Sequence, residues 1–141
     1  MLAGILLAVS IAESSGLKTP RPIVTPTLHY PEMARMARIQ GIVTLKVRLA
    51  DDGRVTGAEV AGTTSNTTKG GDKFLSNAAI DNVTKWEFEP TDANAPTIRE
   101  FEMQYVFRLR GKPSPNASTR MKVKSPPLAV EITGRPPQVM Y

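Results

Sequence analysis

Few residues in this sequence could carry out chemistry. It contains one histidine, His29, and no cysteine, so thiolate nucleophiles, thiolate metal sites and disulfides are excluded. His29 stands just before Tyr30, and no group of metal-binding residues surrounds it in the sequence. A catalytic histidine needs a partner that it activates or that orients it. We therefore predict no metal site, no cofactor and no catalytic role for His29.

Acidic pairs are the remaining candidates, and their surroundings favour structural roles. Asp51 and Asp52 precede Gly53, a combination typical of a tight hairpin turn. Glu87 and Glu89 stand at strand spacing, but a glycosidase pair also needs a concave site, for which a small domain has little room. No glycine-rich segment matches a phosphate-binding loop. The sequence therefore predicts that the protein is not an enzyme.

Composition divides the chain into a foldable middle and two ends rich in proline. Residues 28–110 hold three of the twelve prolines, and their eleven Lys/Arg balance eleven Asp/Glu. The net charge of +5 comes from the ends, with +1 in residues 1–27 and +4 in residues 111–141. Basic charge without interleaved aromatic residues argues against nucleic-acid binding. We predict a Pro-containing linker at 14–27, one domain at 28–110 and a disordered basic tail at 111–141.

The start of the chain is apolar up to Glu13. A membrane-spanning helix needs about 20 apolar residues, so the segment 1–13 is too short to span. Its length and the small residues before Glu13 resemble a secretory signal, with a short inner-membrane anchor or a start codon assigned too late as alternatives. We expect a periplasmic or exported protein.

A short helix that leads directly into a strand is predicted at the start of the domain. Pro31 suits the first helical position, and Gly41 is placed to end the helix. Apolar and polar residues alternate over 43–49, which indicates a strand with one buried face. The turn at Gly53 then joins this strand to a second one over 54–62.

A second helix and a third strand complete the pattern. Apolar residues recur at helical spacing between Leu75 and Trp86, which predicts an amphipathic helix that ends before Pro90. Alternation returns over residues 98–109. The predicted fold class is α+β, an α-β-β-α-β domain with a three-stranded antiparallel sheet and a helix packed on one face.

Taken together, these motifs resemble the C-terminal domain of the TonB family, the energy transducers of Gram-negative bacteria. The resemblance spans about Leu28 to Leu109. It rests on Tyr30-Pro31, the Arg38-Ile39-Gln40-Gly41 junction, the Asp52-Gly53-Arg54-Val55 turn, the Trp86-x-Phe88-x-Pro90 exit and the closing aromatic strand. We expect structural roles for Tyr30, Pro31, Gly41, Gly53, Trp86, Phe88 and Pro90.

The resemblance implies a module that grips an extended segment of an outer-membrane receptor, or of another envelope protein, by strand addition. The implied grip is on the last strand, as an open sheet edge. The candidate partner-binding residues are Ile98, Glu100, Glu102, Gln104, Val106 and Arg108. The alternating run from Leu128 to Ile132 offers an alternative to a disordered tail, an extra strand that folds back and blocks this edge.

A second hypothesis is a structural protein. The domain would be a self-associating scaffold, with a homodimer as one form, and its basic tail would contact anionic lipid head groups or cell-wall polymer. Salt distinguishes the two hypotheses, because contacts made by an exposed basic tail weaken with ionic strength and main-chain strand addition does not.

Overall fold

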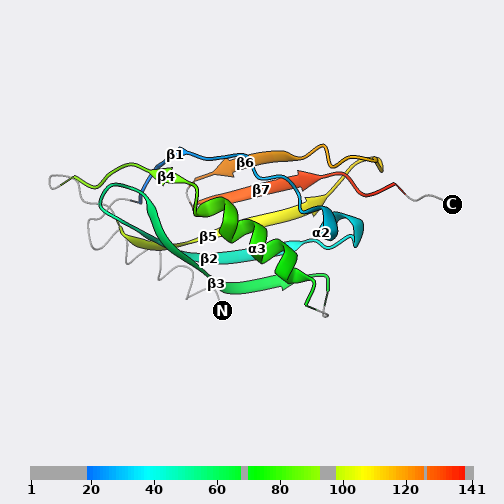
Figure 1. Ribbon diagram of the computed structural model, residues 1–141, viewed down its shortest axis with the longest axis horizontal. Helices are drawn as coiled ribbons and strands as arrows, with labels where there is room; N and C mark the ends of the chain where they lie inside the picture. Colours follow the sequence, from blue (N-terminus) through cyan, green and yellow to red (C-terminus); the bar gives the residue numbers. More distant parts are fainter. Residues whose placement is uncertain (1–18, 68–69, 93–97, 126, 139–141) are drawn as a thin grey trace.

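The computed structural model describes residues 19–67, 70–92, 98–125 and 127–138. Five strands form one sheet in the order β3-β2-β5-β7-β6 (Figure 1). They are β2 (Gly41–Leu49), β3 (Val55–Ser65), β5 (Glu100–Leu109), β6 (Arg120–Lys124) and β7 (Ala129–Gly134). The short strands β1 (Pro22–Val24) and β4 (Glu87–Phe88) pair with each other in a separate two-stranded sheet.

Two helices accompany the sheet, the short α2 (Glu32–Met36) and the longer α3 (Asp72–Val83). Figure 1 shows α3 lying across one face of the sheet, over β2 and β3. The segment that leads from β1 to α2 runs alongside β6 in the same view. Within the described ranges, no helix is long and apolar enough to cross a membrane.

The core lies between α3 and the sheet face beneath it. The alternation in β2 places Val43, Leu45 and Val47 on this face, where none of them is exposed to solvent. Leu75 and Ala79 of α3 are equally buried, as helical spacing predicts. The predicted α-β-β-α-β order is therefore confirmed over this part of the chain.

Asn82 is a buried polar residue that ties α3 to the sheet and to the N-terminal segment. Its side-chain oxygen accepts hydrogen bonds from Trp86 Nε1 and Tyr105 Oη, both at 2.8 Å. Its side-chain nitrogen donates to the carbonyl of Pro26 at 2.9 Å. Burial raises the pKa of Tyr105, which keeps this phenol neutral as a donor.

The tail expected to be disordered instead completes the sheet, so the prediction of three strands is corrected to five. Its prolines misled the composition argument, because Pro127 and Pro136 lie outside β6 and β7 and remove no strand hydrogen bond. Val130 and Ile132 of β7 are fully buried, in the alternation that the sequence showed from Leu128 onward. The alternative of a folded-back strand is therefore correct.

The predicted boundaries at the N-terminal side also change. The predicted linker 14–27 contains β1, and the predicted domain start at residue 28 cuts through a segment that belongs to the fold. The signal-like segment 1–13 lies outside the described residues.

Four of the seven expected structural residues fill their roles as aromatic core residues or a turn glycine. Tyr30, Trp86 and Phe88 are buried, and Tyr30 Oη donates to the carbonyl of Ile39. Gly53 has a φ of +90°, and a Cβ there would lie 1.9 Å from the carbonyl oxygen of Phe88. Only glycine fits this turn.

The other three expected structural residues differ in detail from the sequence prediction. Pro31 stands at the N-cap position, one residue before the first helical position of α2 that the sequence suggested. Pro90 is exposed just after β4. Gly41 does not end the helix, because α2 ends at Met36 and Arg38 takes the left-handed conformation with φ 56°. Gly41 opens β2, where a Cβ would lie 2.4 Å from the carbonyl oxygen of Thr64 on the neighbouring strand.

Candidate functional site

The structure disperses the acidic and histidine residues that could have carried chemistry. Asp51 and Asp52 lie in the hairpin turn and pair with arginines, and Glu89 pairs with an arginine near the N-terminal side of the fold. Glu87 and His29 are both exposed. No group of metal-ligating side chains occurs in the described ranges. The residues therefore offer no catalytic arrangement.

The strand expected to bind the partner is not at the edge of the sheet. β5 pairs with β2 on one side and with β7, in parallel, on the other. The parallel ladder runs from Gln104 to Leu109, and Gln104 N also donates to the carbonyl of Leu128 at 3.3 Å. The open edge predicted at Gln104, Val106 and Arg108 is therefore wrong, because the C-terminal strand occupies it.

The first half of the candidate set lies beyond the start of β7. Ile98 precedes β5, while Glu100 and Glu102 lie on the sheet face opposite α3. Glu100 contacts Arg48 at 2.8 Å and Lys46 at 3.2 Å. Hydrogen bonds from Arg48 and then Lys46 lower the pKa of Glu100. Its charge is therefore satisfied within the sheet.

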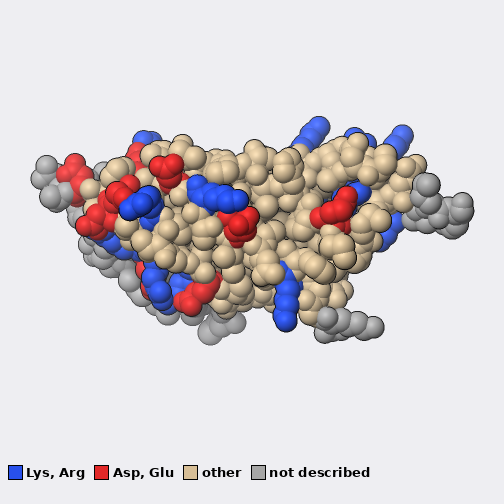
Figure 2. Space-filling view, viewed as in Figure 1, with Lys and Arg blue, Asp and Glu red and all other residues tan. Residues whose placement is uncertain are grey.

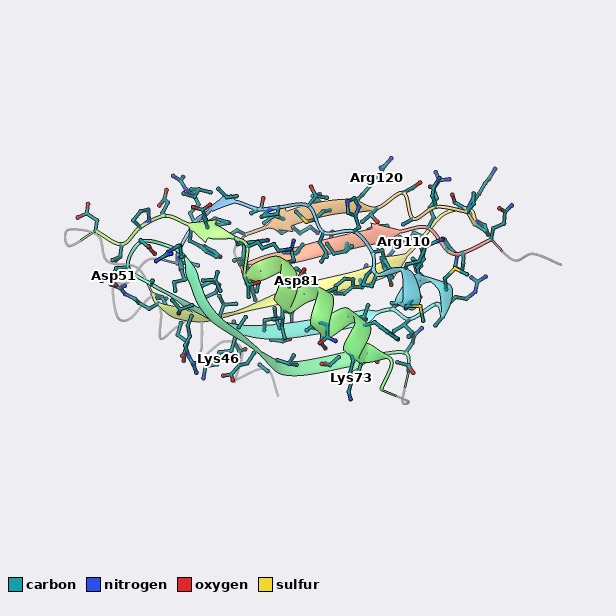
Figure 3. All side chains as sticks on the ribbon, viewed as in Figure 1. Lys46, Asp51, Lys73, Asp81, Arg110 and Arg120 are labelled. Carbon is teal, nitrogen blue, oxygen red and sulfur yellow. The ribbon has the colours of Figure 1, made fainter. Side chains whose placement is uncertain are left out.

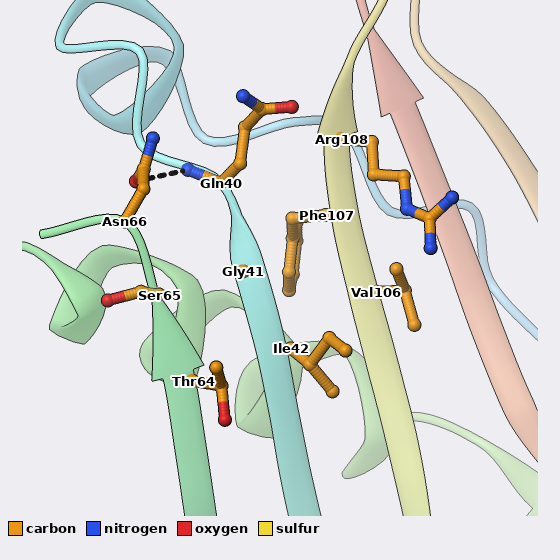
Figure 4. A pocket seen from close by; sticks show the side chains of 9 residues that line it. All are labelled: Gln40, Gly41, Ile42, Thr64, Ser65, Asn66, Val106, Phe107 and Arg108. Carbon is orange, nitrogen blue, oxygen red and sulfur yellow. Dashed lines mark hydrogen bonds between the residues drawn. The ribbon is translucent and has the colours of Figure 1, made fainter.

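A shallow hollow lies on the sheet face opposite α3, over the ends of β2, β3 and β5 (Figure 4). Its lining residues are Gln40, Gly41, Ile42, Thr64, Ser65, Asn66, Val106, Phe107 and Arg108. Gln40 N donates to Asn66 Oδ1 at 3.0 Å on its rim. Arg108 is the one ionisable side chain among these nine, so the hollow lacks the pair of groups that acid–base catalysis needs.

β3 is the long free edge of the sheet. In the described part of the chain it pairs with β2 alone, although it has eleven residues. Leu49 N donates to the carbonyl of Arg99, so the odd-numbered residues of β2 bond to β5 and the even-numbered ones bond to β3. The residues of β3 between those bonded partners direct their N–H and C=O groups away from β2, to the side where the described chain places no strand. They are Ala58, Val60, Thr63 and Ser65.

The two edge strands differ in how they are protected against pairing. β3 carries one charged side chain, Glu59, and no proline in its eleven residues. β6 carries Arg120, Lys122 and Lys124 within five residues. Edges that must stay unpaired typically carry charge or proline. The sheet is therefore protected by charge at β6 and unprotected at β3. Two register shifts interrupt the pairing of β3 with β2, and the stretches 57–60 and 62–65 pair regularly.

Exposed apolar side chains occur both on β3 and on the helix that packs over it. Val60 pairs with buried Leu45 and so faces the α3 side of the sheet, yet it is 41% exposed. Phe74, in the first turn of α3, is also 41% exposed. Sequence reasoning missed this edge because Gly57 and Gly62 hide the alternation of β3. The signal that could have found it is the near absence of charge and proline over residues 55–65.

Comparison with known proteins places the fold. A family model described as Gram-negative bacterial TonB protein C-terminal matches residues 26–109. A solution NMR structure of the Pseudomonas aeruginosa TonB C-terminal domain is 22% identical and superposes with a TM-score of 0.51. That match covers 66% of this chain and 89% of the other. None of the curated proteins matches the chain.

Proposed function

The chain belongs to the family of Gram-negative bacterial TonB C-terminal domains, and on this premise we propose that it binds one extended segment of an envelope protein by strand addition at β3. The resemblance drawn from the sequence motifs is confirmed. The family is periplasmic and envelope-associated, couples transport without catalysis, and interacts with outer-membrane receptors. The proposed partner is such a receptor segment.

The openness of β3 is the observation that carries this proposal. Main-chain N–H and C=O groups at Ala58, Val60, Thr63 and Ser65 point away from the sheet, so an incoming strand can bond to them. Apolar side chains of the incoming strand would cover Val60 and Phe74, which are already partly exposed. The affinity would come from the main chain and the preference for apolar residues from this patch.

The buried side chains of the C-terminal strand argue against binding at β5. Leu128, Val130 and Ile132 are 4%, 0% and 0% exposed. Exposing one such side chain costs about 1.5–3 kcal/mol, so displacing all three costs about 5–9 kcal/mol. The whole free energy of unfolding of a small protein is about 5–15 kcal/mol. A partner that displaced β7 from β5 would therefore have to offset a cost comparable with the whole free energy of unfolding.

Chemical-shift mapping by NMR tests the proposal. The isotope-labelled chain is titrated with peptides from the periplasm-facing N-terminal segments of outer-membrane receptors. We expect the largest amide shifts at Ala58, Val60, Thr63 and Ser65. Shifts confined to residues 104–109 would instead mean that the peptide displaces β7. Dimers that form without peptide and leave no response to it would show that β3 pairs with a second copy.

A proline at the open edge makes the test specific to the main chain. Thr63→Pro removes an outward N–H without breaking the β2–β3 ladder, and proline is tolerated at such edge positions. Thr63→Val is the matched control, because it changes the side chain and keeps the N–H. Losing one hydrogen bond of about 1 kcal/mol weakens binding about fivefold. Equal affinity of the two variants would contradict strand addition at β3.

A further inference from the structure

Three segments that are far apart in the sequence meet at one end of the molecule. Buried Arg35 of α2 connects them, because its guanidinium donates to the carbonyls of Ser114, Pro115 and Arg135. Arg110 N donates to the carbonyl of Gly134 at 2.8 Å in the same region. The end is therefore a folded surface made of residues 30–40, 108–120 and 133–138.

This end gathers exposed cations that form no ion pair with a described residue. Six arginine and lysine side chains are exposed there, and none forms an ion pair with a described residue. They are Arg38, Arg108, Arg110, Lys112, Arg120 and Arg135. Glu32 is the one acidic residue in the three segments, and it forms an ion pair with buried Arg35. Six exposed cations thus share one end, and of these Arg108 lies close enough to Glu131 of β7 to help lower the pKa of that carboxyl.

The pictures agree with this distribution. Figure 2 shows blue side chains predominating around the right-hand end, while red side chains are concentrated toward the opposite end. In Figure 3, Arg110 and Arg120 lie at the right, and Asp51 lies at the far left. The molecule therefore presents a basic end to any anionic surface.

Two methionines add apolar surface to the same end. Met33 and Met36 of α2 are 63% and 56% exposed, whereas Ala34 and Arg35 between them are buried. Their spacing of three residues places both on one side of the short helix. Exposed apolar side chains can mark an interaction surface, where a partner removes them from water. Methionine suits such a surface because its flexible side chain adapts to irregular shapes.

We propose that this basic end, with Met33 and Met36, binds the surface of a membrane that contains anionic phospholipids. Lysine and arginine near a bilayer are attracted to its phosphate groups, and apolar side chains reach the boundary of the acyl chains. An anionic polymer in water would satisfy the cations but would leave the methionines exposed. The combination of charge and apolar surface therefore favours lipid. This surface adjoins the end of β3 but uses side chains and not the main-chain groups of the edge, so its failure would leave the strand-addition proposal untouched.

Vesicle co-sedimentation of the full chain tests the proposal. Vesicles of phosphatidylglycerol and phosphatidylcholine in equal parts are compared with vesicles of phosphatidylcholine alone, over a range of salt concentrations. The apolar segment 1–13 is common to all variants, and the neutral vesicles measure its contribution. We expect binding to the anionic vesicles that weakens as salt rises. Equal binding to both kinds of vesicle would overturn the proposal.

Variants with matched charge changes locate the contact. Arg110→Gln with Lys112→Gln should lower the affinity for anionic vesicles about 10- to 30-fold, given the attraction of each cation to the surface. Arg54→Gln with Lys85→Gln makes the same change in net charge at the opposite end and should have less than about a twofold effect. Equal losses in the two double variants would overturn the proposal.

The methionines provide the readout that separates lipid from polymer. Met33→Ser with Met36→Ser should weaken vesicle binding and leave its salt dependence unchanged, because no charge is removed. Unchanged vesicle affinity in this variant would refute the apolar part of the contact. Binding to anionic cell-wall fragments, without binding to vesicles, would overturn the proposal in favour of a polymer.

Discussion

Truncation of Ile132 to alanine probes whether the C-terminal strand is part of the cooperative core. Ile132 lies on β7, opposite Phe107 of β5 and Met121 of β6, and none of its surface is exposed. If β7 is an integral strand, Ile132→Ala leaves a cavity in the buried core of the domain. If the tail is only loosely attached, the protein loses little.

The expected size of the effect follows from this burial. Replacing a fully buried isoleucine with alanine typically costs about 2–5 kcal/mol. With a urea m-value of about 1–3 kcal/mol/M for a small protein, the midpoint falls by about 1–3 M. Thr133→Ala is the matched control, since Thr133 is the next residue on β7 and is only partly buried. Its expected cost is below about 1 kcal/mol.

Urea unfolding followed by tryptophan fluorescence measures both variants, because Trp86 is buried in the same core. Coincident transitions by fluorescence and circular dichroism establish that unfolding is two-state. A midpoint for Ile132→Ala within error of the Thr133→Ala midpoint would refute the reasoning. That result would mean that β7 detaches without unfolding the domain, and it would reopen β5 as a binding edge.

Three further predictions concern the core, an ion pair and the turn. Asn82→Ala leaves two buried ring donors and one carbonyl unpaired, so denaturation should show a loss of about 3–6 kcal/mol, against little change for exposed Asn77→Ala. The hydrogen bond from Arg35 lowers the pKa of Glu32, so the stability from this pair is present above the unfolded pKa and is lost as pH falls through the folded one. Urea titrations should therefore find Glu32→Gln less stable than wild type at pH 7 and equal to it in acid, and a constant difference would contradict this. Gly53→Ala should cost more than about 1 kcal/mol in the same assay, because of its φ of +90° and the close carbonyl, and an unchanged midpoint would show that the turn relaxes.

Periodic segments and turn residues made much of this fold predictable. The alternation in β2 and β5, the helical spacing in α3 and the glycine of the β2–β3 turn are local signals, and the structure has all of them. The order of the strands in the sheet was not local. β7 pairs with β5 across a connection that contains β6, which no local pattern predicts. The proline count also led to a prediction of disorder, although the alternation from Leu128 had indicated a strand.

The candidate site shows the same division between local and distant signals. Whether a strand is an edge depends on its neighbours, and the neighbour of β5 is supplied by the last part of the described chain. Burial of Arg35 was equally unpredictable, because all its acceptors apart from nearby Glu32 are backbone carbonyls 79 to 100 residues away. Met33 and Met36 stand at helical spacing and yet are both exposed, so the spacing alone did not show which side of α2 is buried.

Residue-resolved hydrogen exchange with and without receptor peptide would show whether the partner adds to β3 while β7 keeps β5 closed. The amides of Ala58, Val60, Thr63 and Ser65 should exchange quickly in the free chain and become protected by peptide. The amides of residues 104–108 should stay protected throughout. Faster exchange at residues 104–108 on binding, with no new protection in β3, would mean that the partner displaces β7 and binds at β5.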